Sequence, residues 1–234
     1  MMIGLRSTSL GELKSISTRP VQGLWPLPTH HSRSVSGNFS PGRQERSMLY
    51  PQSASVTLVL GGVRSGKSRL AQQIAEHAER VTFIATAERR DDHEMHAKIA
   101  RHRSERPSGW ITIEEPIQLA HAIREAGAES DVVLIDCLTL FASNLLEAYE
   151  EDPDGLETQI DDLLLALSQS PCSVVLVSNE VGSGVVPAYE LGRRFRDLVG
   201  EINQRVASIA GTVLLMVAGL PFPLKGSVPN EVKP

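Results

Sequence analysis

Eight consecutive residues, GGVRSGKS, have the types and spacing of a phosphate-binding loop. They fit the pattern G-x-x-x-x-G-K-[ST] between an apolar strand and a helix. In this pattern the backbone N–H groups curl around a polyphosphate, the lysine reaches its β- and γ-phosphates, and the final hydroxyl binds Mg²⁺. The chain is therefore predicted to bind a nucleotide, and the alternative is a glycine-rich turn with a solvated lysine. The predicted contacts are Gly61, Gly62, Val63, Arg64, Ser65, Gly66, Lys67 and Ser68, with Lys67 also catalytic.

A carboxylate stands at the end of a later apolar run. Asp136 follows VVLI in the segment DVVLIDCLTLF. Phosphate-loop proteins place an acid that holds Mg²⁺ after such a strand. Asp136 and Ser68 are therefore the predicted metal ligands. The structural alternative for Asp136 is a strand-end aspartate that caps a turn.

A compact polar cluster, His102-Arg103-Ser104-Glu105-Arg106, follows Lys67 by about 35 residues. The two arginines could hold phosphates while the imidazole attacks phosphorus. The reference pKa of histidine, about 6.5, leaves the ring mostly neutral and nucleophilic at pH 7 to 8. The alternative is an ordinary surface or core histidine. The N-K-x-D signature of guanine-reading switch GTPases is absent from the chain, and a phosphate loop alone does not name a reaction.

Strands alternate with helices along the chain. Apolar runs and alternating patterns predict strands at 56–60, 81–86, 110–116, 131–141, 173–187 (with a glycine-rich turn at its carboxyl end) and 212–224. Helical spacing predicts helices at 68–79, 91–103, 117–129 and 189–210, with two more inside 143–170 that an acidic break at 150–155 separates. The apolar stripe of the last helix is predicted to be Leu191, Phe195, Leu198, Ile202 and Val206.

This alternation indicates an α/β fold with a mainly parallel sheet and helices on both faces. Ligands of such sheets bind at the carboxyl ends of the strands. Four predicted strands end near Gly61, Thr86, Asp136 and Asn179. Four separate segments are therefore expected to meet at one edge of the sheet.

Length and charge narrow the class of protein. The 234 residues allow one sizeable domain with an appendage. Beyond residue 50 the chain holds 17 basic and 26 acidic residues, a net charge of −9, which argues against nucleic-acid binding. No apolar run reaches 18 residues, so no membrane span is expected. Cys137 and Cys172 look like small core residues in a reducing compartment, which indicates a cytoplasmic protein.

Residues 1–53 differ from the rest, being rich in Ser, Arg, Pro and His without sustained periodicity. They are predicted to be an extension of a single domain at 54–234. Three explanations stay open: an organelle transit peptide, a flexible tail, or a true translation start at Met48.

Five segments together resemble the bifunctional adenosylcobinamide kinase / adenosylcobinamide-phosphate guanylyltransferase family of cobalamin assembly. The resemblance runs from about Val56 to the C-terminus, and H-R-x-x-R-P-x-x-W-x-T-x-E-E-P is its most specific part. The segments are GGVRSGKS, FIATAE, DDHEMHAKIARHRSERPSGWITIEEP, LIDCLTLFASNLL and VVLVSNEVGSGVVP.

The resemblance implies a RecA-like P-loop fold, a homotrimer and two reactions. In the first, ATP or GTP would phosphorylate adenosylcobinamide with Mg²⁺. In the second, His102 would take GMP covalently from GTP and pass it on to give adenosylcobinamide-GDP. The implied GTP contacts are the phosphate loop together with Ala85, Thr86, Ala87, Arg103, Ser104, Glu105, Arg106, Glu114 and Asp136.

Two alternatives from other classes stay open. One is a P-loop small-molecule kinase in which His102 is merely structural. The other is a non-catalytic module whose nucleotide drives assembly with a partner.

Overall fold

A computed structural model describes residues 55–87, 107–229 and 232. The predicted helix 91–103, the cluster His102–Arg106 and residues 1–53 lie outside this part of the chain. The strands described are β1 (Val56–Gly61), β2 (Val81–Ala85), β3 (Ile111–Glu114), β4 (Val132–Asp136), β5 (Ser173–Asn179), β6 (Thr212–Val217) and β7 (Leu220–Lys225). The helices are α1 (Lys67–Ala75), α3 (Leu119–Glu129), α4 (Leu138–Ala148), α5 (Pro153–Ser168) and α6 (Glu190–Ile209).

The strands form one sheet in the order β3-β2-β4-β5-β1-β6-β7. Every neighbouring pair is parallel except β6 with β7, which are antiparallel. The central strands are buried on both faces, which explains why their sequences are continuous apolar runs. The expected α/β fold with a mainly parallel sheet is confirmed.

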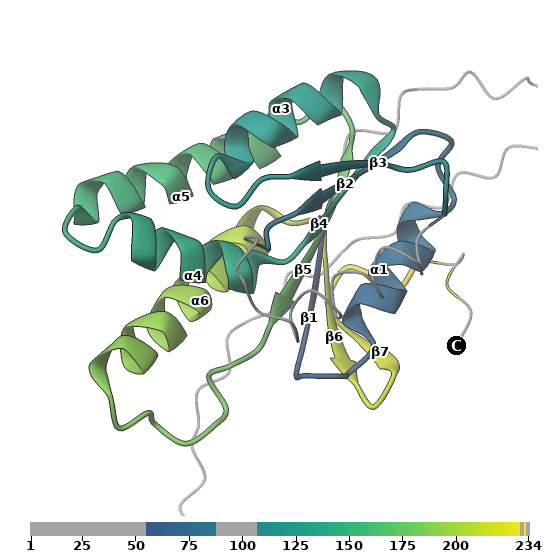
Figure 1. Ribbon diagram of the computed structural model, residues 1–234. Coiled ribbons are helices and arrows are strands. Elements are labelled where there is room, and N and C mark those ends of the chain that lie inside the picture. Colours follow the sequence, from purple (N-terminus) through teal and green to yellow (C-terminus); the bar gives the residue numbers. More distant parts are fainter. Residues whose placement is uncertain (1–54, 88–106, 230–231, 233–234) are drawn as a thin grey trace, which may run out of the picture. The chain divides into compact units, whose positions relative to one another are not determined.

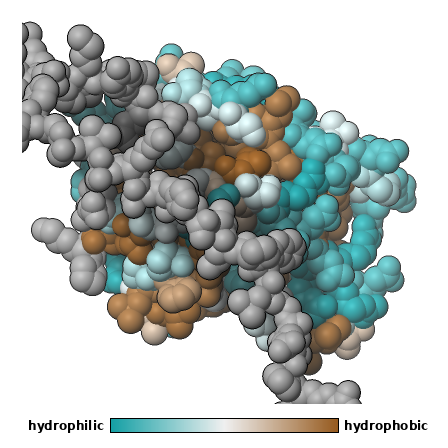
Figure 2. Space-filling view, turned by 180° about the vertical axis from the view of Figure 1, so that it is seen from behind, coloured by the Kyte–Doolittle hydropathy of each residue, from teal (hydrophilic) through white to brown (hydrophobic). Residues whose placement is uncertain are grey.

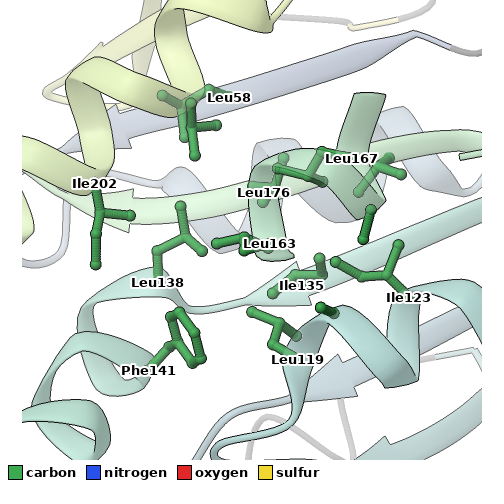
Figure 3. Packing of buried hydrophobic residues seen from close by; sticks show 14 of the residues in the cluster. Leu58, Leu119, Ile123, Ile135, Leu138, Phe141, Leu163, Leu167, Leu176 and Ile202 are labelled. Atoms are coloured by element: carbon green, nitrogen blue, oxygen red, sulfur yellow. The ribbon is translucent and has the colours of Figure 1, made fainter. Parts of the chain in front are cut away.

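Helices cover both faces of the sheet (Figure 1). On one face α3, α4, α5 and α6 pack against side chains such as Leu58 and Ile135, and on the other α1 packs against side chains such as Val59. Successive residues of a strand point to opposite faces, so adjacent residues of β1 enter different cores. Figure 3 shows the larger core, where Leu58, Ile135 and Leu176 of the strands meet residues of the covering helices.

Two expected strands are wrong in extent. The strand predicted at 131–141 ends at Asp136, and α4 begins at Leu138. Its residues Leu138, Phe141 and Leu145 have helical spacing and are buried, but a short apolar run cannot by itself separate strand from helix.

The strand predicted at 212–224 is a hairpin. Ala218 and Gly219 have φ of 52° and 84°, and they reverse the chain between β6 and β7. Several apolar side chains of this hairpin are exposed and gather at the lower left of the face in Figure 2; they are Val217, Leu220, Phe222 and Leu224.

The structure also bears on the predicted helix stripe, the end of the first helix, the two cysteines and membrane spans. Leu191, placed in the apolar stripe of the last helix, is exposed, whereas Leu198, Ile202 and Val206 are buried as expected. The helix predicted at 68–79 ends at Ala75. Cys137 and Cys172 are not bridged. Among the described residues, no helix is both long and apolar enough to cross a membrane.

Candidate active site

Strand register brings the predicted strand ends together at one edge. Gly61 pairs with Asn179, and Ala85 pairs with both Glu114 and Asp136. Since these strands are parallel, their carboxyl ends lie on the same side of the sheet. The expected meeting of four segments is therefore confirmed, and the phosphate loop leaves from β1 at this edge.

The N-terminus of α1, which follows the phosphate loop, has neither a side-chain cap from the described residues nor an acidic residue in its first turn. Gly66 is the N-cap, with φ 98°, and no side chain caps the helix among the described residues. The first turn contains no acidic residue. The first backbone N–H groups of a helix have no partner inside it and carry a partial positive charge. This end of α1 is therefore suited to an anion such as a phosphate.

The first glycine of the loop is required by its surroundings. Gly61 has φ 152°, and a Cβ there would lie 2.6 Å from the carbonyl oxygen of Met216 and from Oγ of Ser65. The turn of the β6–β7 hairpin also supports the loop, because the Gly219 N–H donates to the Ser65 carbonyl at 3.0 Å. The shape of the loop thus depends on β6, which follows it by about 150 residues in the chain.

Lys67 lies at the start of α1 and is only 8% exposed. Its ammonium group donates to the Gly62 carbonyl at 2.7 Å. Burial lowers the pKa of Lys67, and the nearby charge of Asp136 opposes this shift. A buried ammonium group with a negative neighbour and a loop carbonyl is placed to exchange that carbonyl for phosphate oxygens.

Ser68 and Asp136 offer oxygen ligands of the kind that Mg²⁺ prefers. Mg²⁺ keeps several waters and is usually held by one or two carboxylates and the phosphates of the substrate. The described residues contain no group of three or more His, Cys, Asp or Glu that could form a metal cage. The donor set therefore fits a metal ion that arrives with a nucleotide rather than one bound permanently.

Thr86 connects the ends of β2 and β4. It is fully buried, and its hydroxyl donates to the Cys137 carbonyl at 2.7 Å and accepts from the Cys137 N–H at 2.9 Å. Burial raises the pKa of the Cys137 thiol to about 11. Thr86 was predicted to contact GTP. In the structure its hydroxyl makes both of these hydrogen bonds to the backbone of Cys137, the residue after Asp136.

Three polar residues that make hydrogen bonds to this edge of the sheet were missed in the sequence. Asn144 donates to the carbonyls of Thr86 and Pro116, Thr139 accepts from the Asn179 N–H, and Asn203 donates to the Asn179 carbonyl. Each of these three polar residues lies on a helix that packs against the larger core. For Asn144 and Asn203, the signal that could have found them was a polar residue within the apolar face of a predicted helix. Thr139 fell within the strand predicted at 131–141, so that signal did not apply to it.

Glu180 follows β5 beside the loop. Its backbone N–H donates to the Gly61 carbonyl at 3.1 Å, and its carboxylate accepts from the Gly182 N–H and the Ser183 hydroxyl. These hydrogen bonds, that from Ser183 first, lower the pKa of Glu180. Glu180 thus shapes the glycine-rich turn after β5.

The remaining predicted contacts divide into two groups. Ala85 and Ala87 flank Thr86 and are partly buried, and Glu114 ends β3 with an exposed side chain. His102, Arg103, Ser104, Glu105 and Arg106 lie outside the described residues, so their part in the site stays a prediction.

Comparisons with known proteins agree with this geometry. Residues 57–224 match the family model "Cobinamide kinase / cobinamide phosphate guanyltransferase". The chain is 47% identical over 170 residues to the "Bifunctional adenosylcobalamin biosynthesis protein CobP" of Pseudomonas aeruginosa, covering 72% of this chain and 96% of the relative. It is 42% identical over 179 residues to the "Bifunctional adenosylcobalamin biosynthesis protein CobU" of Salmonella typhimurium, covering 72% and 98%.

A solved ATPase of a type III secretion system is also similar, at 15% identity and a TM-score of 0.45, over 69% of this chain and 50% of that one. The fold class of this chain follows from the order and direction of the strands in its sheet. The family match spans more than half of the chain, and two relatives exceed 40% identity over nearly their whole lengths. The chain therefore belongs to the cobinamide kinase / cobinamide phosphate guanyltransferase family.

Proposed function

We propose that the chain phosphorylates adenosylcobinamide with ATP or GTP and then transfers GMP from GTP to the product, giving adenosylcobinamide-GDP. Family membership supports the pair of reactions. The observation that carries the proposal for this chain is the buried Lys67 beside Asp136 at the N-terminus of α1. This is an arrangement for stabilising charge on a transferring phosphoryl group.

In the kinase step the substrate hydroxyl attacks the γ-phosphorus and the nucleoside diphosphate leaves. Lys67 and the N–H groups at the start of α1 would hold the phosphates in place. Ser68 and Asp136 would hold Mg²⁺, which supplies positive charge to the phosphate oxygens. Positioning and charge account for most of the catalysis expected of such a site.

In the transfer step a ring nitrogen of His102 would attack the α-phosphorus of GTP. An N–P bond forms as the bond to the β-phosphate oxygen breaks, and pyrophosphate leaves. A phosphate oxygen of the phosphorylated substrate would then attack the same phosphorus and release His102. The GTP contacts proposed for this step are the phosphate loop, Ala85–Ala87, Arg103–Arg106, Glu114 and Asp136.

The test uses the full chain with Mg²⁺ and GTP labelled with ³²P at the α-position, beside His102→Ala. After denaturation, label on the parent that survives alkali, is lost in acid and is absent from the variant would support a guanylyl-histidine. An unlabelled parent would leave the P-loop kinase alone, to be tested with γ-labelled nucleotide and cobinamide. Label on both proteins would keep the transfer but reject His102 as its nucleophile.

Three finer features complete the proposal. The chain would act as a homotrimer in the cytoplasm and would not bind nucleic acid, the last in keeping with its acidic body. Sedimentation equilibrium would refute the trimer by returning another mass. Nucleotide-dependent assembly without turnover of cobinamide would instead support the non-catalytic alternative.

A further inference from the structure

Two asparagines on the covering helices, Asn144 (buried) and Asn203 (partly buried), donate hydrogen bonds to the edge of the sheet. Asn144 of α4 is 7% exposed, and its Nδ2 donates to the carbonyls of Thr86 and Pro116 at 2.8 and 3.0 Å. On α6, Nδ2 of Asn203 donates to the Asn179 carbonyl at 3.0 Å. Both helices cover the same face of the sheet (Figure 1). Each asparagine therefore holds backbone just at or beyond the end of a strand.

Asn144 makes hydrogen bonds to the backbone that follows β2 and β3. Thr86 directly follows β2, and Pro116 lies two residues beyond β3. The side-chain amide of Asn144 thus joins two chain segments. Their carbonyl groups, at Thr86 and Pro116, lie beyond the ends of β2 and β3. The same two segments carry Ala85, Ala87 and Glu114, the GTP contacts proposed above.

Asn203 makes a hydrogen bond to the last residue of β5, which pairs with the last residue of β1. The Asn179 backbone is fixed twice, by Oγ1 of Thr139 at its N–H and by Asn203 at its carbonyl. Asn179 pairs with Gly61, the first residue of the phosphate loop. The Oδ1 of Asn203 is buried and makes no hydrogen bond within the described residues, so Nδ2 carries the polar role of this side chain.

Buried carbonyls beyond the ends of strands keep their positions only if another donor replaces the ladder. An asparagine supplies that donor without adding charge to the site. Loss of the donor would allow shifts of the order of 1 Å, which can change a reaction rate by about a hundredfold. The backbone shift would be largest at the residues next to the released carbonyl and smaller at strand ends farther along the edge of the sheet.

We propose that Asn144 is a positioning residue for the transfer of GMP, whereas Asn203 positions the phosphate loop, which holds the nucleotide in both steps. This inference rests on the proposed function. The two asparagines act through different parts of the edge: Asn144 acts through the backbone of Thr86 and Pro116, and Asn203 acts through the backbone of Asn179.

The test compares Asn144→Leu with Asn203→Leu, because leucine has a similar size and no donor. Two rates are measured on the same full-length preparations: labelling of the chain by α-³²P-GTP, and transfer of γ-³²P from ATP to adenosylcobinamide. Both are divided by the concentration of folded sites, obtained by titration with a fluorescent nucleotide. Leu145→Ala is the control, since it creates a cavity on α4 without touching the edge.

Asn144→Leu is expected to slow labelling about tenfold to a hundredfold and the kinase step less than about threefold. Asn203→Leu is expected to slow both steps by similar factors, because the phosphate loop serves both, and Leu145→Ala is expected to leave the ratio of the two rates unchanged. Equal losses in both rates for Asn144→Leu, or a loss confined to one rate for Asn203→Leu, would overturn the proposal. Should Asn144→Leu fail to fold, Asn144→Ala admits water to the two carbonyls, and an unchanged ratio there would overturn it equally. A parent chain without either activity would instead refute the proposed function.

Discussion

Replacing Lys67 by methionine should separate stability from catalysis. The Lys67 ammonium group is buried and makes a charged hydrogen bond of 2.7 Å to the Gly62 carbonyl. Such a bond contributes about 1.5–3 kcal/mol, but removing an ammonium group from water costs several kcal/mol. Burial is the leading cause of the lowered pKa of Lys67, so desolvation disfavours the charged ammonium group in the folded chain. Methionine fills similar space without a charge, so the free energy of unfolding should change by less than about 1 kcal/mol or increase.

The effect on phosphoryl transfer should be far larger. Removing one preorganised donor to a developing charge typically costs about 10²–10³ in kcat, or roughly 3–4 kcal/mol. The assay follows γ-³²P transfer to adenosylcobinamide at saturating nucleotide, with urea unfolding measured on the same preparations. The lowered pKa also sets a sign: the folded chain releases the Lys67 proton before the unfolded chain does. The stability of the parent should therefore rise relative to Lys67→Met as the pH approaches 10.5.

Lys225→Met is the matched control. The Lys225 ammonium group is exposed and donates to the Ala207 and Ser208 carbonyls in the last turn of α6. Its loss should cost about 0.3–1 kcal/mol of stability and leave the kinase rate unchanged. The reasoning fails if Lys67→Met keeps kcat within about threefold of the parent, or if it loses more than about 2 kcal/mol of stability.

Two further changes test the loop and the buried thiol. Gly61→Ala should lower the free energy of unfolding in urea by about 2–5 kcal/mol, because the φ of Gly61 is 152° and a Cβ there would lie 2.6 Å from the Met216 carbonyl oxygen. Gly62→Ala is the control, since its Cβ would meet nothing within 4 Å, and its free energy of unfolding should stay near that of the parent. Equal destabilisation by the two substitutions would refute the packing argument. In the folded chain the pKa of the Cys137 thiol is raised to about 11 from its ordinary value of 9.0. The stability that the thiol contributes is therefore complete below pH 9 and is lost as the pH rises toward 11, by up to about 1.4 kcal/mol per pH unit. The difference in unfolding free energy between the parent and Cys137→Ala, compared at pH 8 and pH 10.5, should shift against the parent, and a constant difference would contradict the assignment.

The parts of the site that the sequence predicted are those encoded by short stretches. The loop GGVRSGKS determines a local backbone shape, and an apolar run followed by Asp136 indicates a strand end whatever the strand pairs with. The parts that sequence reasoning missed depend on distant partners. Thr86 and Asn144 are 58 positions apart, and Asn179 and Asn203 are 24 apart. No local pattern records which carbonyl an asparagine will reach.

Errors in the elements have the same origin. The stretch 131–141 is apolar throughout, and only packing against α3 and β5 decides that it bends after Asp136 into a helix. The β6–β7 hairpin turns at Ala218 and Gly219, where φ is positive, and apolar residues stand on both sides of the turn. Periodicity reports which residues are apolar, not where the chain reverses.

Local sequence patterns were enough to predict the α/β alternation, the nucleotide loop and the strand ends that meet beside it, because backbone preference and side-chain period act over a few residues. Folding was needed to establish the strand order β3-β2-β4-β5-β1-β6-β7, the lowered pKa of Lys67 and the hydrogen bonds that the asparagine side chains make at the edge. These properties arise from desolvation and from hydrogen bonds between segments that meet only when the sheet assembles. They therefore belong to the folded chain and not to any stretch of it.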